Sequence, residues 1–240
     1  MLEKYTFDTY VSGDCNKYAL LLARLAVESP GMYNPLVIYG DSGLGKTHLL
    51  NAIYNYVREH DPSKRIHLLS CNEFVDIFFD ALYENLTEQW TEYWIDTDFL
   101  LIDDIHILER KNATQSNIMS LLLLLAERHC QIVMTSSIPP ENLTVLHDTF
   151  VHEIEGSIYA DIGPLDAETR KMIVIRKASE FGIRLSKESA DFVSELGFKN
   201  VRAIEGVLSK LRAQTELMGS AADLKAVIES CCIGNPNAYK

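Results

Sequence analysis

The hydrophobic pattern of the first two thirds of the chain alternates between short apolar runs and stretches with helical spacing. Apolar runs predict buried strands over 33–39, 65–70, 99–103 and 131–136, with a candidate fifth strand over 157–162. Apolar positions three and four residues apart predict helices over 48–60, 71–95 (as two helices split near 85–87) and 117–129, and a short helix that opens at Pro139-Pro140. Strands alternating with helices predict an α/β fold with a parallel sheet and right-handed crossovers.

The pattern changes after Gly163-Pro164, where only helical spacing remains. It predicts four helices, over 166–181, 186–196, 201–218 and 221–232. We therefore expect two domains, an α/β domain over 1–163 and a small all-helical domain over 164–240.

Composition narrows the setting of the protein. Within 240 residues no apolar run reaches the roughly 18–20 residues that cross a bilayer, and the first residues lack the apolar segment of a secretory signal. The odd number of cysteines, five, and the lack of a C-x-x-C pair favour a reducing cytoplasm without structural zinc. The net charge of −12 disfavours unaided binding to DNA, which is itself a polyanion.

A glycine-rich loop lies between the first predicted strand and the helix that follows it. Residues 40–47, GDSGLGKT, match the pattern G-x-x-x-x-G-K-[ST]. The glycines allow backbone N–H groups to surround a phosphate chain, and the next helix points its positive end at the same place. Lys46 is expected to reach the outer phosphates and the Thr47 hydroxyl to bind Mg²⁺.

The third predicted strand supplies the expected complement to this loop. It ends in Asp103 and Asp104 after the apolar run FLLI. We expect Asp103 to hold Mg²⁺ through its water shell and Asp104 to orient or polarise an attacking water.

Several further segments resemble one known family. YTFD at 5–8 followed by Val11, Gly13 and Asn16, the run YNPL at 33–36, and GLGKTHL at 43–49 are similar to the nucleotide-binding core of the DnaA replication initiators, a branch of the AAA+ ATPases. The runs LIDDI at 101–105, ETR at 168–170 and NVR at 200–202 continue the likeness, which covers nearly the whole chain.

The resemblance implies a P-loop AAA+ sheet domain followed by a small helical lid, with ATP or ADP and Mg²⁺ as cofactors. It places Tyr10 and Val11 beside the adenine, and Arg202 at the γ-phosphate. Without the resemblance, Arg202 has the alternative of being an ordinary surface arginine. The residues implied to surround the phosphates are Gly40, Ser42, Gly43, Leu44, Gly45, Lys46, Thr47 and His48. Thr47 and Asp103 are the implied metal residues, and Lys46 and Asp104 the implied catalytic ones.

The sequence departs from the family pattern at three places. Glu153 stands where the family carries an arginine finger, and no Lys or Arg occurs from His129 to Thr169. A carboxylate cannot stabilise a transferring phosphoryl group, so we expect weak or partner-dependent hydrolysis. Ser137-Ile138 replaces an acidic-basic pair, and the chain stops before the helix-turn-helix module that reads duplex DNA in full-length initiators.

The stretch from Cys71 to Asp98 is a fourth sign in the same direction. It contains eight carboxylates and no basic residue, which disfavours guidance of single-stranded DNA. Six aromatic side chains in this stretch have a core interpretation, with a partner surface or base stacking as alternatives: Phe74, Phe78, Phe79, Trp90, Tyr93 and Trp94.

Three functions are compatible with these features. The leading hypothesis is a DnaA-like regulator of replication initiation that binds nucleotide and contacts an initiator or another AAA+ protein. Nucleotide-dependent oligomers are compatible with this hypothesis. The second is the ATPase core of an initiator, and the third is a relative of the helicase loaders. We expect no sequence-specific duplex binding, at most weak binding to single strands, and no membrane association.

Overall fold

The computed structural model describes residues 4–110, 112–143, 157–183, 185 and 187–218. The chain divides into two compact units that interleave along the sequence. The first unit comprises Met1–Tyr10, Asn16–Gly40 and Gly45–Ile162, and the second comprises Val11–Cys15, Asp41–Leu44 and Gly163–Lys240. The predicted domain division at residues 163 and 164 stays a prediction.

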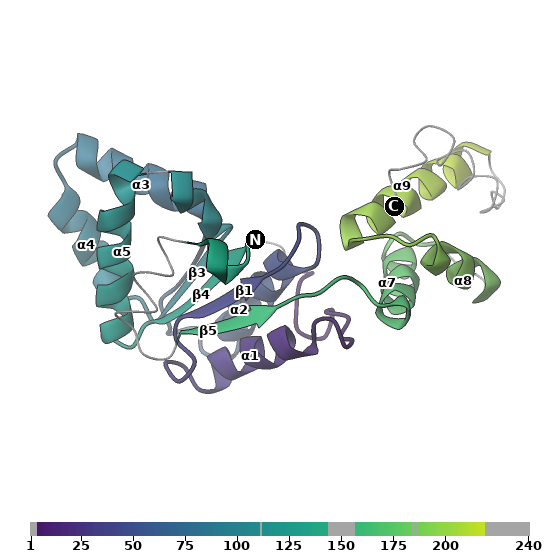
Figure 1. Cartoon of the computed structure of the whole chain (residues 1–240), viewed down its shortest axis with the longest axis horizontal. Coiled ribbons are helices and arrows are strands. Elements are labelled where there is room, and N and C mark those ends of the chain that lie inside the picture. The colour runs from purple at the N-terminus through teal and green to yellow at the C-terminus, as the bar shows by residue number, and fades with distance from the viewer. Residues whose placement is uncertain (1–3, 111, 144–156, 184, 186, 219–240) are drawn as a thin grey trace. The chain divides into compact units, whose positions relative to one another are not determined.

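The first unit is built on a parallel sheet, as predicted (Figure 1). Its strands are β1 (Leu36–Tyr39), β2 (Ile66–Ser70), β3 (Phe99–Asp103), β4 (Gln131–Ser136) and β5 (Ile158–Asp161). The strand order is β2-β3-β4-β1-β5, and every pairing is parallel. The carboxyl ends of all five strands therefore meet at one edge, where ligands of open α/β sheets bind.

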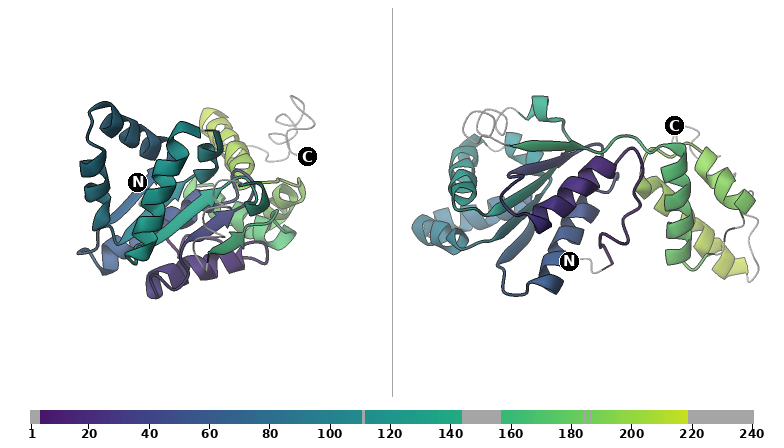
Figure 2. Two further views of the ribbon diagram at one scale, coloured as in Figure 1. Left: turned by 60° about the vertical axis from the view of Figure 1, so that its left-hand side comes forward. Right: turned by 90° about the horizontal axis from the view of Figure 1, so that it is seen from below.

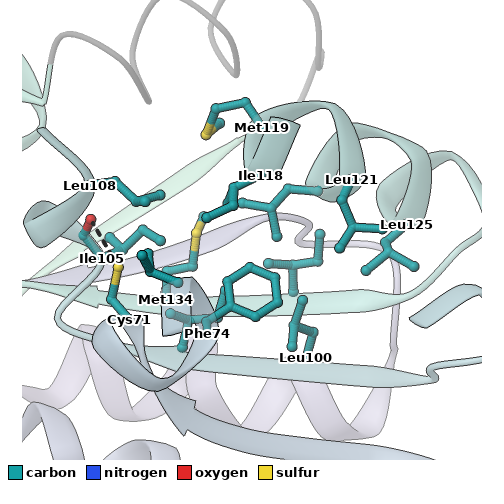
Figure 3. Packing of buried hydrophobic residues seen from close by; sticks show 14 of the residues in the cluster. Cys71, Phe74, Leu100, Ile105, Leu108, Ile118, Met119, Leu121, Leu125 and Met134 are labelled. Carbon is teal, nitrogen blue, oxygen red and sulfur yellow. Dashed lines mark hydrogen bonds between the residues drawn. The ribbon is translucent and has the colours of Figure 1, made fainter. Parts of the chain in front are cut away.

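Helices cover both faces of this sheet (Figures 1 and 2). One face carries α1 (Lys17–Glu28) and α2 (Lys46–His60), and the other carries α3 (Cys71–Tyr83), α4 (Thr87–Ile95) and α5 (Asn112–Glu127). Two 3₁₀ turns, η1 (Ile105–Arg110) and η2 (Pro140–Asn142), follow β3 and β4. Apolar side chains of α3 and α5 pack on β3 and β4 (Figure 3), and this packing forms the core that positions the edge of the sheet.

The second unit contains α7 (Ala167–Glu180), α8 (Lys187–Glu195) and α9 (Val201–Met218). Asp166 caps α7 by accepting hydrogen bonds from the backbone N–H and the hydroxyl of Thr169, and these bonds lower its pKa to about 2. The Arg170 guanidinium donates to the carbonyls of Leu165, Ser194 and Phe198, which ties α7 to the chain on either side of it. The predicted helix over 221–232 lies outside the described residues.

The structure corrects several predicted bounds. β1 begins at Leu36 instead of residue 33 because the Asn34 side chain bonds to the Cys130 carbonyl and the Ile132 N–H, each at 2.7 Å, in place of a strand pairing. α5 begins at Asn112, five residues before the predicted start. α1 was not predicted, although its buried residues Ala19, Leu22, Ala23 and Ala26 have helical spacing.

The six aromatic residues of the base-free stretch divide into two groups. The core interpretation is confirmed for Phe74, Phe78, Trp90 and Trp94, which are buried. It is wrong for Phe79 and Tyr93, which remain 41% and 61% exposed on the outer sides of their helices. None of the helices within the described ranges combines the length and hydropathy that a bilayer span requires.

Candidate functional site

The loop from β1 to α2 is shaped by glycines that no other residue could replace without strain. Gly40 has φ 148°, and a Cβ there would lie 2.4 Å from the Ile162 carbonyl oxygen. Gly45 has φ 105°, and a Cβ would lie 3.1 Å from the Tyr10 ring. Backbone therefore approaches backbone and ring too closely for a side chain, which is the requirement for a loop whose N–H groups surround a phosphate.

Lys46 is the first residue of α2 and is only 5% exposed. Its Nζ donates to the Gly40 carbonyl at 2.6 Å and to the Ser137 hydroxyl at 3.2 Å. The ammonium group therefore lies between the start of the loop and the end of β4, beside the backbone N–H groups of the first turn of α2. This positive edge fits an anionic ligand with several oxygens, such as a phosphate chain.

Thr47 and Asp103 meet at the same edge. The Thr47 hydroxyl donates to one Asp103 carboxylate oxygen at 2.7 Å, and the Thr135 hydroxyl donates to the other. Hydroxyl and carboxylate oxygens are the ligands that Mg²⁺ prefers, directly or through water. The donor set therefore fits the predicted ion. Among the described residues, no group of three or more His, Cys, Asp and Glu side chains gathers closely enough to form a separate metal site.

Asp104 has the left-handed conformation that is rare for residues other than glycine, with φ 58°. Its N–H donates to the Thr135 hydroxyl at 2.9 Å, so Thr135 holds both carboxylate residues at the end of β3. The Asp104 side chain is half exposed and lies 3.9 Å from His106 Nδ1, which accepts a hydrogen bond from the Ser137 N–H at 3.3 Å. The chain thus holds an accessible carboxylate beside the loop, which is the arrangement needed to orient a water.

Thr135 and His106 were missed by the sequence reasoning. The run 132–140, which contains Thr135, also resembles the family, but no role was predicted for this threonine, and it reaches Asp103 because β3 and β4 pair in register. His106 lies two residues after Asp104, and that short spacing is the signal that would have found it. Ser137, noted as a departure from the family pattern, supplies the hydroxyl that accepts from Lys46.

His48 connects α2 to the N-terminal segment of the first unit. Its ring stacks on Tyr5 at a centroid distance of 4.5 Å and meets Tyr10 edge-on at 5.1 Å. Its Nε2 lies 2.9 Å from the Thr6 carbonyl oxygen and 3.2 Å from the Thr9 hydroxyl. The ring therefore positions the segment that carries Tyr10. Because the ring makes these contacts, the predicted contact of His48 with phosphate would use its backbone.

The second unit includes the middle of the glycine-rich loop. Arg202 Nη1 donates to the Ser42 hydroxyl at 2.6 Å, and the Val201 N–H donates to the Gly43 carbonyl at 2.9 Å. Gly43 has φ 80°, and a Cβ there would lie 3.2 Å from side-chain carbons of Asn200 and Arg202. Arg202 is therefore hydrogen-bonded to the glycine-rich loop itself. Val11 also belongs to this unit, whereas Tyr10 belongs to the first, and Glu153 lies outside the described residues.

Tyr39, the last residue of β1, is a further ionisable group beside the glycine-rich loop. Burial raises the pKa of the Tyr39 hydroxyl, and the nearby carboxylates of Asp161 and Glu141 raise it further. It therefore stays neutral at physiological pH and adds no negative charge near the loop.

Comparison with known proteins places this geometry in a family. Residues 1–161 match the family described as the bacterial DnaA ATPase domain. The chain is 36% identical over 216 residues to the chromosomal replication initiator protein DnaA of Symbiobacterium thermophilum. That alignment covers 90% of this chain and 47% of the relative, so the chain spans about half the length of the curated relative.

Solved structures agree with the sequence comparison. The crystal structure of domain III of the Thermotoga maritima replication initiation protein DnaA superposes with a TM-score of 0.86 at 34% identity, covering 94% of both chains. A structure of the replication initiator DnaA bound to AMPPCP and single-stranded DNA superposes with a TM-score of 0.79 at 31% identity, covering 90% of this chain and 68% of the other. These matches confirm the predicted AAA+ fold. The chain therefore belongs to the DnaA family, by its match to that family's ATPase domain.

Proposed function

We propose that this protein binds ATP or ADP with Mg²⁺ and acts in the cytoplasm in bacterial replication initiation or its regulation, through contacts with an initiator or another AAA+ protein. The observation that carries the nucleotide part is the Lys46, Thr47 and Asp103 network at one edge of the sheet. The family match and the AMPPCP bound to a related initiator support the same ligand.

Most of the predicted residues have a proposed task in this site. Gly40, Gly43 and Gly45 admit the phosphates to the backbone, Lys46 neutralises their charge, and Arg202 reports on the outermost phosphate. Thr47 and Asp103 hold Mg²⁺, which when bound neutralises phosphate charge and orients the oxygens. Asp104 orients water, and Tyr10 and Val11 border the adenine. Residues 1–163 act as the nucleotide-binding domain and 164–240 as its lid.

The regulator interpretation is supported by the distribution of charge. Residues 1–162 contain 10 basic and 24 acidic side chains, and the stretch 71–98 contains no base. DNA affinity depends on Lys and Arg near phosphates, so this unit is poorly suited to hold a strand by itself. Hydrolysis is proposed to be slow because Glu153 stands where a finger arginine is expected.

The second candidate is the ATPase core of an initiator itself. Membership of the DnaA family and the single-stranded DNA bound to a related initiator favour it. The two candidates differ in whether this chain binds nucleic acid directly or reaches it through a protein partner.

The nucleotide proposal is tested by thermal unfolding with and without Mg·ATP. A ligand present at a hundredfold excess over its Kd stabilises the folded state by about 2.7 kcal/mol. We expect this shift for the unmodified protein and for Arg58→Ala, an exposed change in the same helix, and no shift for Lys46→Ala. An unchanged melting temperature of the unmodified protein at millimolar ATP contradicts the proposal.

The choice between regulator and initiator core is tested by fluorescence anisotropy with duplex and single-stranded probes. At about 150 mM salt with ATP, we expect no sequence-specific duplex binding and at most weak, salt-sensitive single-strand binding. Submicromolar binding to either probe would restore the initiator interpretation.

A further inference from the structure

The outer side of α3 combines exposed aromatic and acidic residues. The buried side of the helix is Cys71, Phe74, Val75 and Phe78. On the opposite side, Asp76 is followed by Phe79, Asp80 and Tyr83 at three, four and seven residues, so these four share one face. Tyr83 is 91% exposed, and Leu86 is exposed in the turn that leads to α4. Burial within the described part of the fold does not account for these apolar groups.

Most carboxylates of the surrounding stretch make no salt bridge within the part of the chain that the structure describes. Glu73 is used in the α3 capping box, Asp96 pairs with Arg65, and Asp98 pairs with Lys64. The other five make no salt bridge with any residue in the described ranges, and they are Asp76, Asp80, Glu84, Glu88 and Glu92. Basic groups of a partner would therefore lower the mutual repulsion of these carboxylates.

The chemistry of this face excludes most occupants. The exposed carboxylates repel the phosphates of nucleic acid. The described residues contain no group of acidic and metal-binding side chains close enough for a metal ion. A second copy of this chain is a poor match, because the chain has a net charge of −12 and four of the basic residues of α7 and α9 are already paired within the second unit. The paired ones are Lys171 with Asp191, Arg176 and Lys177 with Glu180, Lys177 with Glu205, and Arg212 with Glu216.

We propose that the outer face of α3 and the following turn bind a basic, amphipathic segment of a partner protein. This face, which we call the α3 face, consists of Asp76, Phe79, Asp80, Tyr83, Glu84 and Leu86. Apolar groups of the partner cover Phe79, Tyr83 and Leu86, and its Lys or Arg side chains pair with the carboxylates between them. The inference rests on the proposed function, which requires a protein contact, and it names the surface and the charge of the partner.

The packing beneath the α3 face provides a reporter for binding. The only tryptophans of the chain, Trp90 and Trp94, both lie in α4. Trp90 meets the Phe78 ring edge-on at a centroid distance of 4.9 Å, and Phe78 lies 6.2 Å from the exposed Phe79 ring. A ligand that covers Phe79 therefore acts two rings away from an indole, so its binding is expected to change tryptophan fluorescence.

The test is a titration of Mg·ATP-loaded protein with a tryptophan-free peptide of about 18 residues, built from lysine and leucine at helical spacing. A matching peptide with glutamate in place of lysine is the ligand control. The test variant is Asp76→Lys/Asp80→Lys on the α3 face. The matched control is Glu28→Lys/Glu59→Lys, which changes the net charge equally at exposed positions on the helices that cover the other side of the sheet.

We expect the lysine peptide to bind and to alter the fluorescence, and the glutamate peptide to do neither. The α3-face variant should bind the lysine peptide about tenfold more weakly, a difference of about 1.4 kcal/mol, and the control variant less than about twofold. Tyr83→Ala should weaken binding without changing the melting temperature, because the side chain is almost fully exposed.

Three results would overturn the inference. Equal weakening in both lysine variants would mean that general charge alone attracts the peptide. Tighter binding of a poly-dT strand that competes with the peptide would assign the face to nucleic acid. A dimer seen by sedimentation that Asp76→Lys/Asp80→Lys dissolves would assign it to a second copy. A Mg·ATP thermal shift measured on the same samples separates failure of this inference from failure of the nucleotide proposal.

Discussion

The carboxyl edge of the sheet and the α3 face are both rich in charged groups of the first unit, but the two regions differ in how far these groups are bonded to one another. At the edge, charged and hydroxyl groups bond to one another, as Lys46 does to Gly40 and Ser137, and Thr47 and Thr135 do to Asp103. On the α3 face, Asp76 and Asp80 have no basic partner among the described residues. Preorganised groups suit a small ligand with fixed geometry, whereas unpaired exposed groups suit a large partner that brings its own charges.

The two regions meet at one point of the fold. Ser70 ends β2, pairs in register with Asp103 of β3, and caps α3. The residue that starts the acidic helix is thus a neighbour of the residue proposed to hold the metal. A change at one region is therefore informative when its effect on the other is measured as well.

The largest predicted effect concerns turnover at the edge. If Glu153 occupies the finger position, the protein alone should hydrolyse ATP slowly at every concentration, and Glu153→Arg should raise the rate in a concentration-dependent way. A finger supplied in trans contributes about 10³–10⁵ in rate. Glu28→Arg, with the same charge change at an exposed position of the first unit, is the control and should not do so. Rapid, concentration-dependent hydrolysis by the unmodified protein would show that the edge is already complete.

The second prediction separates the buried side of the α3–α4 region from its exposed side. Trp94 is buried against Phe74 and His67, so Trp94→Ala should destabilise the fold by about 3–5 kcal/mol. Tyr83→Ala should stay within about 0.5 kcal/mol because little is packed against that ring. Urea unfolding followed by circular dichroism measures both. A large loss in Tyr83→Ala would mean that the α3 face serves folding instead of binding.

The sequence predicted the strands of this fold unevenly, for identifiable reasons. β3 and β4 match their predicted bounds because each contains a continuous apolar run, FLLI and IVM, that is bounded by polar residues. β1 was predicted too long because the role of the Asn34 side chain depends on β4, which is distant in sequence. Helix α1 was not predicted, although the helical spacing of its apolar residues was sufficient to predict it.

The site divides in the same way. The glycine-rich loop and Asp103 could be predicted because phosphate and metal binding require the same residue types at the same spacing in any chain that carries these motifs. The link through Thr135 was not, since it arises from pairing of β3 with β4. Likewise, Phe79 and Phe78 are neighbours in sequence with the same side-chain chemistry, and only the direction in which α3 packs decides that one is exposed and the other buried.

The third prediction tests the point where the two regions meet. Ser70→Ala removes the hydroxyl that accepts from the Glu73 N–H and breaks the reciprocal capping box, so it should cost about 1 kcal/mol of unfolding free energy. Ser120→Ala, an exposed change inside α5, is the control and should cost less. If the edge is organised by its own hydrogen bonds, the Mg·ATP thermal shift of Ser70→Ala should equal that of the unmodified protein. A lost shift would mean that the α3 cap supports the nucleotide site.

The smallest predicted effect is a pH dependence of the free energy of unfolding that arises from His67 in β2. His67 packs against Trp94 at a centroid distance of 4.8 Å, and burial followed by the positive charge of Arg65 lowers its pKa. The unfolded chain therefore binds a proton near pH 6.5 that the folded protein refuses, so the free energy of unfolding should fall as the pH drops below about 6.5. Above that pH His67 is neutral in both states and contributes no slope. Urea midpoints measured between pH 5 and pH 8 should show a slope that His67→Gln reduces, while the exposed His60→Gln leaves it in place. Because Arg65 is itself paired with Asp96, the slope should steepen when Asp96→Asn leaves the arginine charge uncompensated beside the imidazole. A slope that is the same in His67→Gln as in the unmodified protein would place the proton uptake elsewhere.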